Sequence, residues 1–144
     1  MRVSDSPLST VIRVRDMQLK KTQRELAVIK VERQTEEVRL TSLEEAQSNA
    51  MTEAVRKMKT RAVDLQTSQA FLQSLSRKIE HQEEKVREVT TAEEGKRVEL
   101  VERSQSKQMV EKIDQRRRDE ETREQERKAQ RVIDVLAQRI RTDL

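Results

Sequence analysis

The chain has 144 residues, of which 40% are charged, 33% hydrophobic and 1% aromatic, and its formal net charge is +4. So little bulky apolar surface excludes a compact globular core, because its burial would not offset the conformational entropy lost on folding. A disordered chain or an extended helical protein remains. One Gly, one Pro and many Arg, Lys, Glu, Gln and Leu residues favour the helical protein.

Several function classes are excluded by what the sequence lacks. Without Cys there is neither a disulfide framework nor a thiolate metal site. No apolar run reaches 18 residues, so we expect no transmembrane helix. The first ten residues, MRVSDSPLST, have no apolar h-region, so we expect no secretory signal and a cytoplasmic protein.

A heptad pattern of apolar residues begins close to the N-terminus. Ser6 is a good N-cap and Pro7 is tolerated at a first helical position, so we predict a helix over about residues 7–56. Nine of 14 positions at alternating steps of four and three are apolar, which indicates a coiled-coil seam. Its polar members either fix the register or mark a marginal seam. The positions are Leu8, Ile12, Arg15, Leu19, Thr22, Leu26, Ile29, Arg33, Glu36, Leu40, Leu43, Gln47, Ala50 and Ala54.

A second seam follows after a break in this pattern. Beyond Ala54 the repeat fades, and we predict a bend over about residues 57–64, although no Gly or Pro marks it. One continuous helix is the alternative. Eight of 14 positions in the next repeat are apolar, which predicts a helix over about residues 65–141. The positions are Leu65, Ser68, Leu72, Leu75, Ile79, Gln82, Val86, Val89, Glu93, Lys96, Leu100, Arg103, Lys107 and Val110.

Gly95 lies inside this second helix. It would face Leu26 if the bend centres near residue 60. A glycine costs roughly 1 kcal/mol relative to alanine within a helix. We interpret Gly95 as a tolerated weak point, and a close approach of the two helices or a hinge is the alternative.

The lengths of the two seams favour a hairpin. A first helix folded back from about residue 60 would run out of chain near Ile113. An island of 15 residues without an apolar side chain, residues 114–128, begins at that point. A helix without a partner needs no apolar stripe. We therefore predict an all-α fold, a long two-helix antiparallel coiled-coil hairpin with an overhanging C-terminal helix, as a single domain over residues 1–144.

The predicted overhang ends in a complete amphipathic face. Its apolar residues fall at helical spacing, and the first helix cannot reach them in this layout. Such an unpartnered face predicts contact with another chain. A membrane-surface helix is the competing interpretation, but aromatic residues and a Lys-rich polar face are missing. The residues are Ala129, Val132, Ile133, Leu136, Ala137 and Ile140.

No pattern typical of catalysis or cofactor binding occurs. His81 is the only histidine, and it has no nucleophile partner in a recognisable motif. There is no phosphate-binding Gly loop and no EF-hand spacing, so we expect no enzyme, cofactor, metal or small-molecule ligand. Three acidic residues directly follow Arg116, Arg117 and Arg118, and the island as a whole has six basic and six acidic residues, so its charges sum to zero. We therefore expect no nucleic-acid partner.

Phe71 is the only aromatic residue of the chain. It is offset from the Leu65, Leu72 and Ile79 seam, which places it partly outward. We expect Phe71 and Leu75 to form a small exposed pair one turn apart; a core aromatic that closes the hairpin end is the alternative.

In length and pattern the chain resembles the FliJ family of the flagellar type III export apparatus and its YscO-type counterparts in virulence secretion. Three stretches carry the resemblance, and their order and spacing hold over nearly the whole chain. They are LSTVIRV at residues 8–14, AFLQSLSRKI at residues 70–79 and EQERKAQRVIDVLAQR at residues 124–139.

The resemblance implies a non-enzymatic stalk in the cytoplasm, peripheral at the inner face of the cell membrane. Its implied partners are a hexameric export ATPase (FliI-like), an export gate protein (FlhA-like) and export chaperones. A Phe–Leu stripe at the start of the second helix would contact the gate through Phe71 and Leu75, with Leu43 at the end of the first helix. The paired chain ends would contact the ATPase, and the implied residues are Leu8, Ile12, Ala129, Ile133, Leu136 and Ile140.

Two other functions compete with the stalk. One is a structural coiled-coil tether or homodimer without an ATPase partner, which predicts a concentration-dependent dimer. The other is a basic helix that binds RNA or anionic lipid, which predicts a steep salt dependence.

Overall fold

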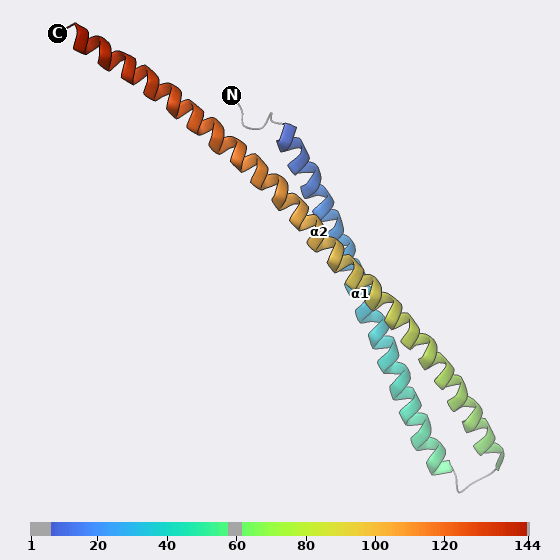
Figure 1. Ribbon diagram of the computed structural model, residues 1–144. Coiled ribbons are helices and arrows are strands. Elements are labelled where there is room, and N and C mark those ends of the chain that lie inside the picture. Colours follow the sequence, from blue (N-terminus) through green and yellow to red (C-terminus); the bar gives the residue numbers. More distant parts are fainter. Residues whose placement is uncertain (1–6, 58–61, 144) are drawn as a thin grey trace. The chain divides into compact units, whose positions relative to one another are not determined.

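The computed structural model describes residues 7–57 and 62–143, which form two helices. Helix α1 spans Pro7–Lys57 and helix α2 spans Ala62–Thr142 (Figure 1). The all-α prediction is confirmed, because every described residue except Asp143 is helical. Helix α2 begins three residues earlier than predicted, with Asp64 in its first turn, where a carboxylate interacts favourably with the helix dipole.

Parts of the chain on which two predictions rest lie outside the described residues. Ser6, the predicted N-cap of α1, is one of them. Most of the predicted bend, residues 58–61, is another. Lys57 and the stretch from Ala62 to Asp64, which were also assigned to the bend, belong to the helices instead.

Residues Lys21–Leu100 form one compact unit in which α1 and α2 pack side by side and antiparallel. Four polar contacts define the register. The residue number of the α2 partner increases from contact to contact while that of the α1 partner decreases, as expected for antiparallel helices. The amide of Gln47 donates to Ser76 Oγ at 3.2 Å, and the Gln82 amide donates to the Glu36 carbonyl oxygen at 3.0 Å. The other two contacts are the ion pairs of Arg33 with Glu93 and of Glu25 with Lys96.

A second unit combines the chain up to Lys20 with the chain from Val101 onward. Within it the helices are again antiparallel. Arg103 Nη1 donates to Gln18 Oε1 at 3.1 Å, and Lys107 Nζ lies 2.8 Å from Asp16 Oδ1. Arg15 donates to the Ser106 hydroxyl. In this unit α2 continues well past the beginning of α1 (Figure 1).

Burial confirms both predicted seams. All 14 seam positions of α1 are buried or partly buried, and so are those of α2 except Leu65, which is 43% exposed. The core is nevertheless thin: among the described residues only Leu75 and Ile79 are buried apolar side chains. A pair of helices encloses each seam side chain from one direction only, so most of them keep contact with water.

Gly95 is exposed, and a Cβ atom added to it would meet nothing within 4 Å. The neighbouring Lys96–Glu25 pair places it opposite the part of α1 near Leu26, as predicted. Close approach of the two helices is therefore not the reason for this glycine. Its role as a tolerated weak point fits the open space around it.

Candidate functional site

The last third of α2 has no covering partner. Every described residue from Arg118 onward is exposed. Ion pairs within the helix stabilise its charged beginning: Arg117 lies 3.2 Å from Asp114 and 2.7 Å from Glu121, and Arg118 lies 3.0 Å from Asp114. The seam therefore ends where the sequence predicted, and the helix continues on local pairs.

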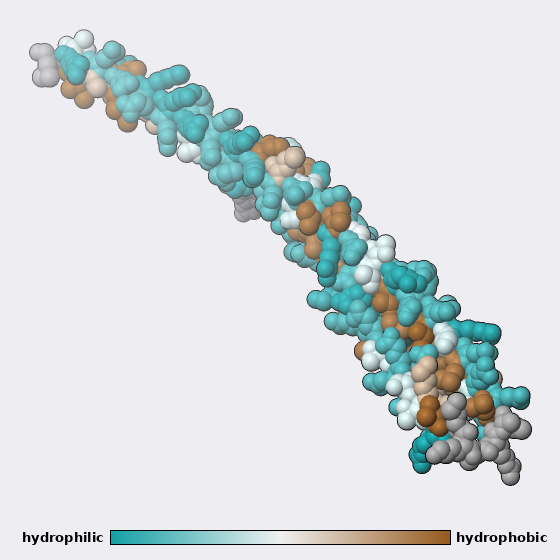
Figure 2. Space-filling view, turned by 60° about the horizontal axis from the view of Figure 1, so that its bottom comes forward, coloured by the Kyte–Doolittle hydropathy of each residue, from teal (hydrophilic) through white to brown (hydrophobic). Residues whose placement is uncertain are grey.

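The apolar face beyond these pairs, which we name the terminal face, is open to solvent. It consists of Ala129, Val132, Ile133, Leu136, Ala137 and Ile140, as predicted. Its larger side chains are 52–64% exposed. Figure 2 shows hydrophobic side chains gathered near this end of the chain. An exposed apolar stripe of this kind is typical of a surface that binds another protein or a membrane.

Val135 widens the terminal face and was missed by the heptad reasoning. It is 51% exposed and lines a shallow hollow with Val132 and Leu136, between Arg131 and Arg139. Its position three residues after Val132 is a helical neighbour spacing, which could have revealed it in the sequence.

Leu8 and Ile12, the other implied ATPase contacts, do not lie beside the terminal face. Both are partly buried in the α1–α2 seam. The contacts of Arg15 with Ser106 and of Asp16 with Lys107 set them against α2 near Ile113. The structure therefore separates the two groups of residues along α2.

At the other end of the seam, Phe71 and Leu75 do not form an exposed pair. Phe71 is 54% exposed, whereas Leu75 is 5% exposed, so the prediction was wrong for Leu75. The reason is the seam spacing: Leu75 follows Leu72 by three residues and turns toward α1. Phe71 precedes Leu72 by one residue, a rotation of about 100° around the helix.

Phe71 lies against the last turns of α1 rather than against Leu43. It borders a hollow lined by Ala50, Glu53 and Lys57 of α1 and by Thr67 and Ser68 of α2. Leu43 is partly buried in the seam. Of the three implied gate-contact residues, Phe71 alone presents most of its side chain to solvent.

The polar seam residues pair across the helices, which favours the interpretation that they fix the register. Arg33 pairs with Glu93, and Gln82 donates to both the carbonyl and the carboxylate of Glu36. Each contact joins two seam positions, so a shift of register would leave buried polar groups without partners. We therefore expect these residues to specify the register of the hairpin.

The same contacts shift the titration of the seam carboxylates. The hydrogen bond from Gln82, and then the charge of Arg39, lowers the pKa of Glu36 below its usual 4.5. Lys96 does the same for the pKa of Glu25, and Lys107 holds the pKa of Asp16 below 3.8. These partners in turn raise the pKa of Lys96 and of Lys107 above 10.5.

We expect helix pairing to weaken in acid. A carboxylate whose pKa is lower in the folded than in the unfolded chain stabilises the fold above its unfolded pKa, and this stabilisation is lost as the pH falls through the folded pKa. The thermal midpoint, followed by circular dichroism, should therefore be constant near neutral pH and fall below about pH 4.5. Glu36→Gln should reduce this acid dependence; a midpoint that rises on acidification would contradict the assigned pairs.

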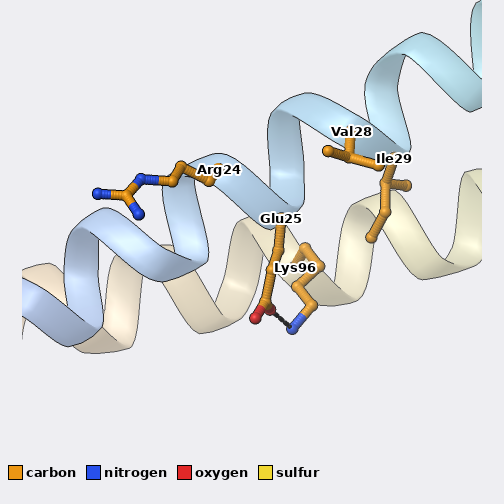
Figure 3. A pocket seen from close by; sticks show the side chains of 5 residues that line it. All are labelled: Arg24, Glu25, Val28, Ile29 and Lys96. Atoms are coloured by element: carbon orange, nitrogen blue, oxygen red, sulfur yellow. Dashed lines mark hydrogen bonds and ion pairs between the residues drawn. The ribbon is translucent and has the colours of Figure 1, made fainter.

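The described residues contain neither a cluster of metal ligands nor a membrane-spanning helix. Among residues 7–57 and 62–143 no group of three or more His, Asp or Glu side chains could hold a metal ion. Neither described helix is apolar enough to cross a membrane. A shallow hollow is lined by Arg24, Glu25, Val28, Ile29 and Lys96, and Glu25 and Lys96 form an ion pair among these residues (Figure 3). The candidate sites that remain are the exposed apolar residues at the end of α2 and around Phe71.

Comparison with known proteins gives one match. The family model described as Flagellar FliJ protein matches residues 4–141, nearly the whole chain. No curated protein and no solved structure matches the chain.

Proposed function

This chain belongs to the flagellar FliJ family, whose members are components of the flagellar export apparatus, and we propose that it acts there as a non-enzymatic central stalk. In this role it couples a hexameric export ATPase to the membrane export gate at the cytoplasmic side of the membrane, and it assists export chaperones. The ATPase binds the terminal face of α2, and the gate contact includes Phe71.

The observation that carries this proposal is the open terminal face. Its larger side chains, Val132, Ile133, Leu136 and Ile140, are more than half exposed, and α1 ends its contact with α2 before it could cover them. A ring of subunits is a suitable partner, because a single slender helix can enter it and be enclosed by apolar walls. The charged stretch before the face can remain helical while it is surrounded by water, because all of its sides are polar.

Phe71 supports a second contact at the opposite end of the seam. It is the only aromatic residue, it is half exposed, and aromatic side chains are enriched among residues that dominate binding energy. Leu75 and Leu43 contribute to this contact by supporting the helix pair beneath Phe71.

Replacing Leu136 and Ile140 by Asp should reduce ATPase stimulation at least tenfold. Two carboxylates on the terminal face would have to be desolvated within the ring, and each lost apolar anchor weakens binding further. The measurement is the ATP hydrolysis rate of the purified export ATPase titrated with each variant. Because both side chains are exposed in the free chain, its helicity by circular dichroism should be unchanged.

A matched control places the same charges elsewhere on the same helical segment. Gln138→Asp with Thr142→Asp has the same spacing, but both residues lie on the opposite side of the helix from Leu136 and Ile140. This control should stimulate the ATPase like the unaltered chain. Equal stimulation by both double variants would remove the terminal face from the ATPase contact.

A further inference from the structure

The outer side of α1 carries a second apolar surface, which we name the valine stripe. It consists of Val28, Val31, Thr35 and Val38, which follow each other at steps of three and four residues. The three valines are 62–67% exposed. Thr35 donates its hydroxyl to the Val31 carbonyl oxygen at 3.0 Å, so its methyl group is left for contact. The stripe is a continuous apolar row on the side of α1 that does not face α2.

Figure 3 shows how the two sides of α1 differ. Glu25 and Ile29 point toward α2, and Glu25 reaches Lys96 there. Arg24 and Val28 extend along the side of α1 and do not reach toward α2 as Glu25 and Ile29 do. A partner can therefore reach the valine stripe without opening the hairpin seam.

The charges at the two ends of the stripe have opposite signs. Lys21 and Arg24 precede the stripe, and Glu45 follows it. Lys21 lies seven residues before Val28, and Glu45 lies seven residues after Val38. Arg24 and Glu45 make no ion pair within the described chain, and Lys21 has a 4.0 Å contact with Glu25, whose carboxylate also binds Lys96. Along α1, basic residues are thus followed by the apolar stripe and then by an acidic residue.

Two copies of α1 that lie antiparallel would therefore present complementary residues to each other. Val28 and Val38 are equally distant from position 33, and so are Val31 and Thr35, and so are Lys21 and Glu45. In an isologous contact, residue i of one copy meets residue j of the other and residue j meets residue i, so a single twofold axis near position 33 satisfies all three pairs at once. A parallel contact would instead place Lys21 against Lys21.

We propose that the valine stripe is a homodimer contact, in which the α1 helices of two copies pack antiparallel around a twofold axis near position 33. Valines interdigitate in the middle, and Lys21 of each copy meets Glu45 of the other. The occupant of the stripe is therefore a second copy of this chain. The contact does not depend on the proposed stalk function, because it uses none of the residues of the terminal face.

The dimer should be weak. Four small side chains from each copy cover much less than the roughly 800 Å² per partner of a standard interface. We therefore expect a dissociation constant on the order of 0.1 mM, and sedimentation velocity from about 10 µM to about 1 mM should show the monomer converting to dimer. A chain that stays monomeric over this range would overturn the proposal.

Val28→Asp with Val38→Asp should weaken the dimer at least tenfold, because facing carboxylates replace facing valines. The matched control is Val98→Asp, an exposed valine on α2 in the same unit, which should leave the dimer unchanged. Circular dichroism checks that each variant keeps its helicity. Equal effects of the two variants would show general aggregation instead of a contact at the stripe.

Charge exchange tests the register without touching the apolar residues. Lys21→Glu alone and Glu45→Lys alone should each weaken self-association several-fold, because each variant faces like charges at both ends. A mixture of these two variants should form a heterodimer at least as well as the unaltered chain dimerises, because both facing pairs regain opposite charges. A mixture that associates no better than its components would rule out the antiparallel register.

The absence of cysteine from the sequence permits a geometric test. Val31→Cys and Thr35→Cys chains, mixed and mildly oxidised, should give the disulfide between the two different chains in preference to either symmetric one. Residues 31 and 35 face each other in the proposed contact, whereas copies of the same residue are offset along the axis by about 6 Å. Equal yields of the three disulfides would contradict the proposed antiparallel contact.

Discussion

Leu75→Ala should lower the free energy of unfolding by about 2–3 kcal/mol, near the lower end of the range for buried leucines. Leu75 is 5% exposed and is one of the two buried apolar residues in the described chain, so its loss leaves a void that few neighbours can fill. Chemical denaturation followed by circular dichroism measures the change. In a thin seam this loss is large, because there is little other apolar burial to offset it.

Phe71→Ala is the comparison, and it should separate stability from binding. The ring of Phe71 is 54% exposed, so its removal should cost about 1 kcal/mol or less in stability. If Phe71 contacts the export gate as proposed, the same change should weaken binding to the purified gate protein at least tenfold. Leu75→Ala, measured at a temperature where it is folded, should bind the gate nearly normally.

The opposite pattern would reverse these roles. A large loss of stability with Phe71→Ala and normal gate binding would make the aromatic ring a structural residue that closes the seam. A combined change of both residues cannot distinguish the two outcomes, since one of them is buried and the other is not.

Replacing Glu36 and Gln82 together by leucine should raise the thermal midpoint by roughly 5 °C or more. Both side chains are buried in the seam, and the Gln82 amide donates to the backbone and the carboxylate of Glu36. Two leucines at facing seam positions would pack against each other and remove the cost of burying polar groups. The pair is therefore expected to specify the register at the expense of stability.

The single variants should behave differently from the double one. Gln82→Leu alone leaves the Glu36 carboxylate buried with Arg39 as its remaining partner, at 2.9 Å, and should lower the midpoint. Each variant is melted under the same conditions, and its mass in solution is measured by light scattering. A double variant that is less stable than both single ones would show that the polar pair holds the helices together.

A stable double variant should also no longer adopt a single register and a single oligomeric state. Without the polar pairs the seam can slide by a heptad or pair between chains, as in coiled coils that lack a polar core residue. We therefore expect mixed oligomeric states in the double variant. A single species with unchanged mass would assign the choice of register to the remaining pairs, such as Arg33 with Glu93.

The sequence determined most of the fold and part of the candidate site. Heptad spacing alone identified both seams, because only side chains on one side of a helix can face a partner, and 27 of the 28 positions are at least partly buried. The length of the first helix predicted where α2 loses its cover. The terminal face followed from the same spacing, since an apolar row beyond the partner has nothing in the chain to bury it.

Only the tertiary structure decided which neighbours share a surface. Phe71 and Leu75 are one turn apart, and the sequence cannot show which of them α1 covers, because burial depends on the rotation of α2 about its axis. The separation of Leu8 and Ile12 from the terminal face likewise depends on the register, which the pairs of Arg15 with Ser106 and Asp16 with Lys107 set. Spacing along one helix fixes its faces, whereas the partner of each face is chosen by contacts between residues far apart in the chain.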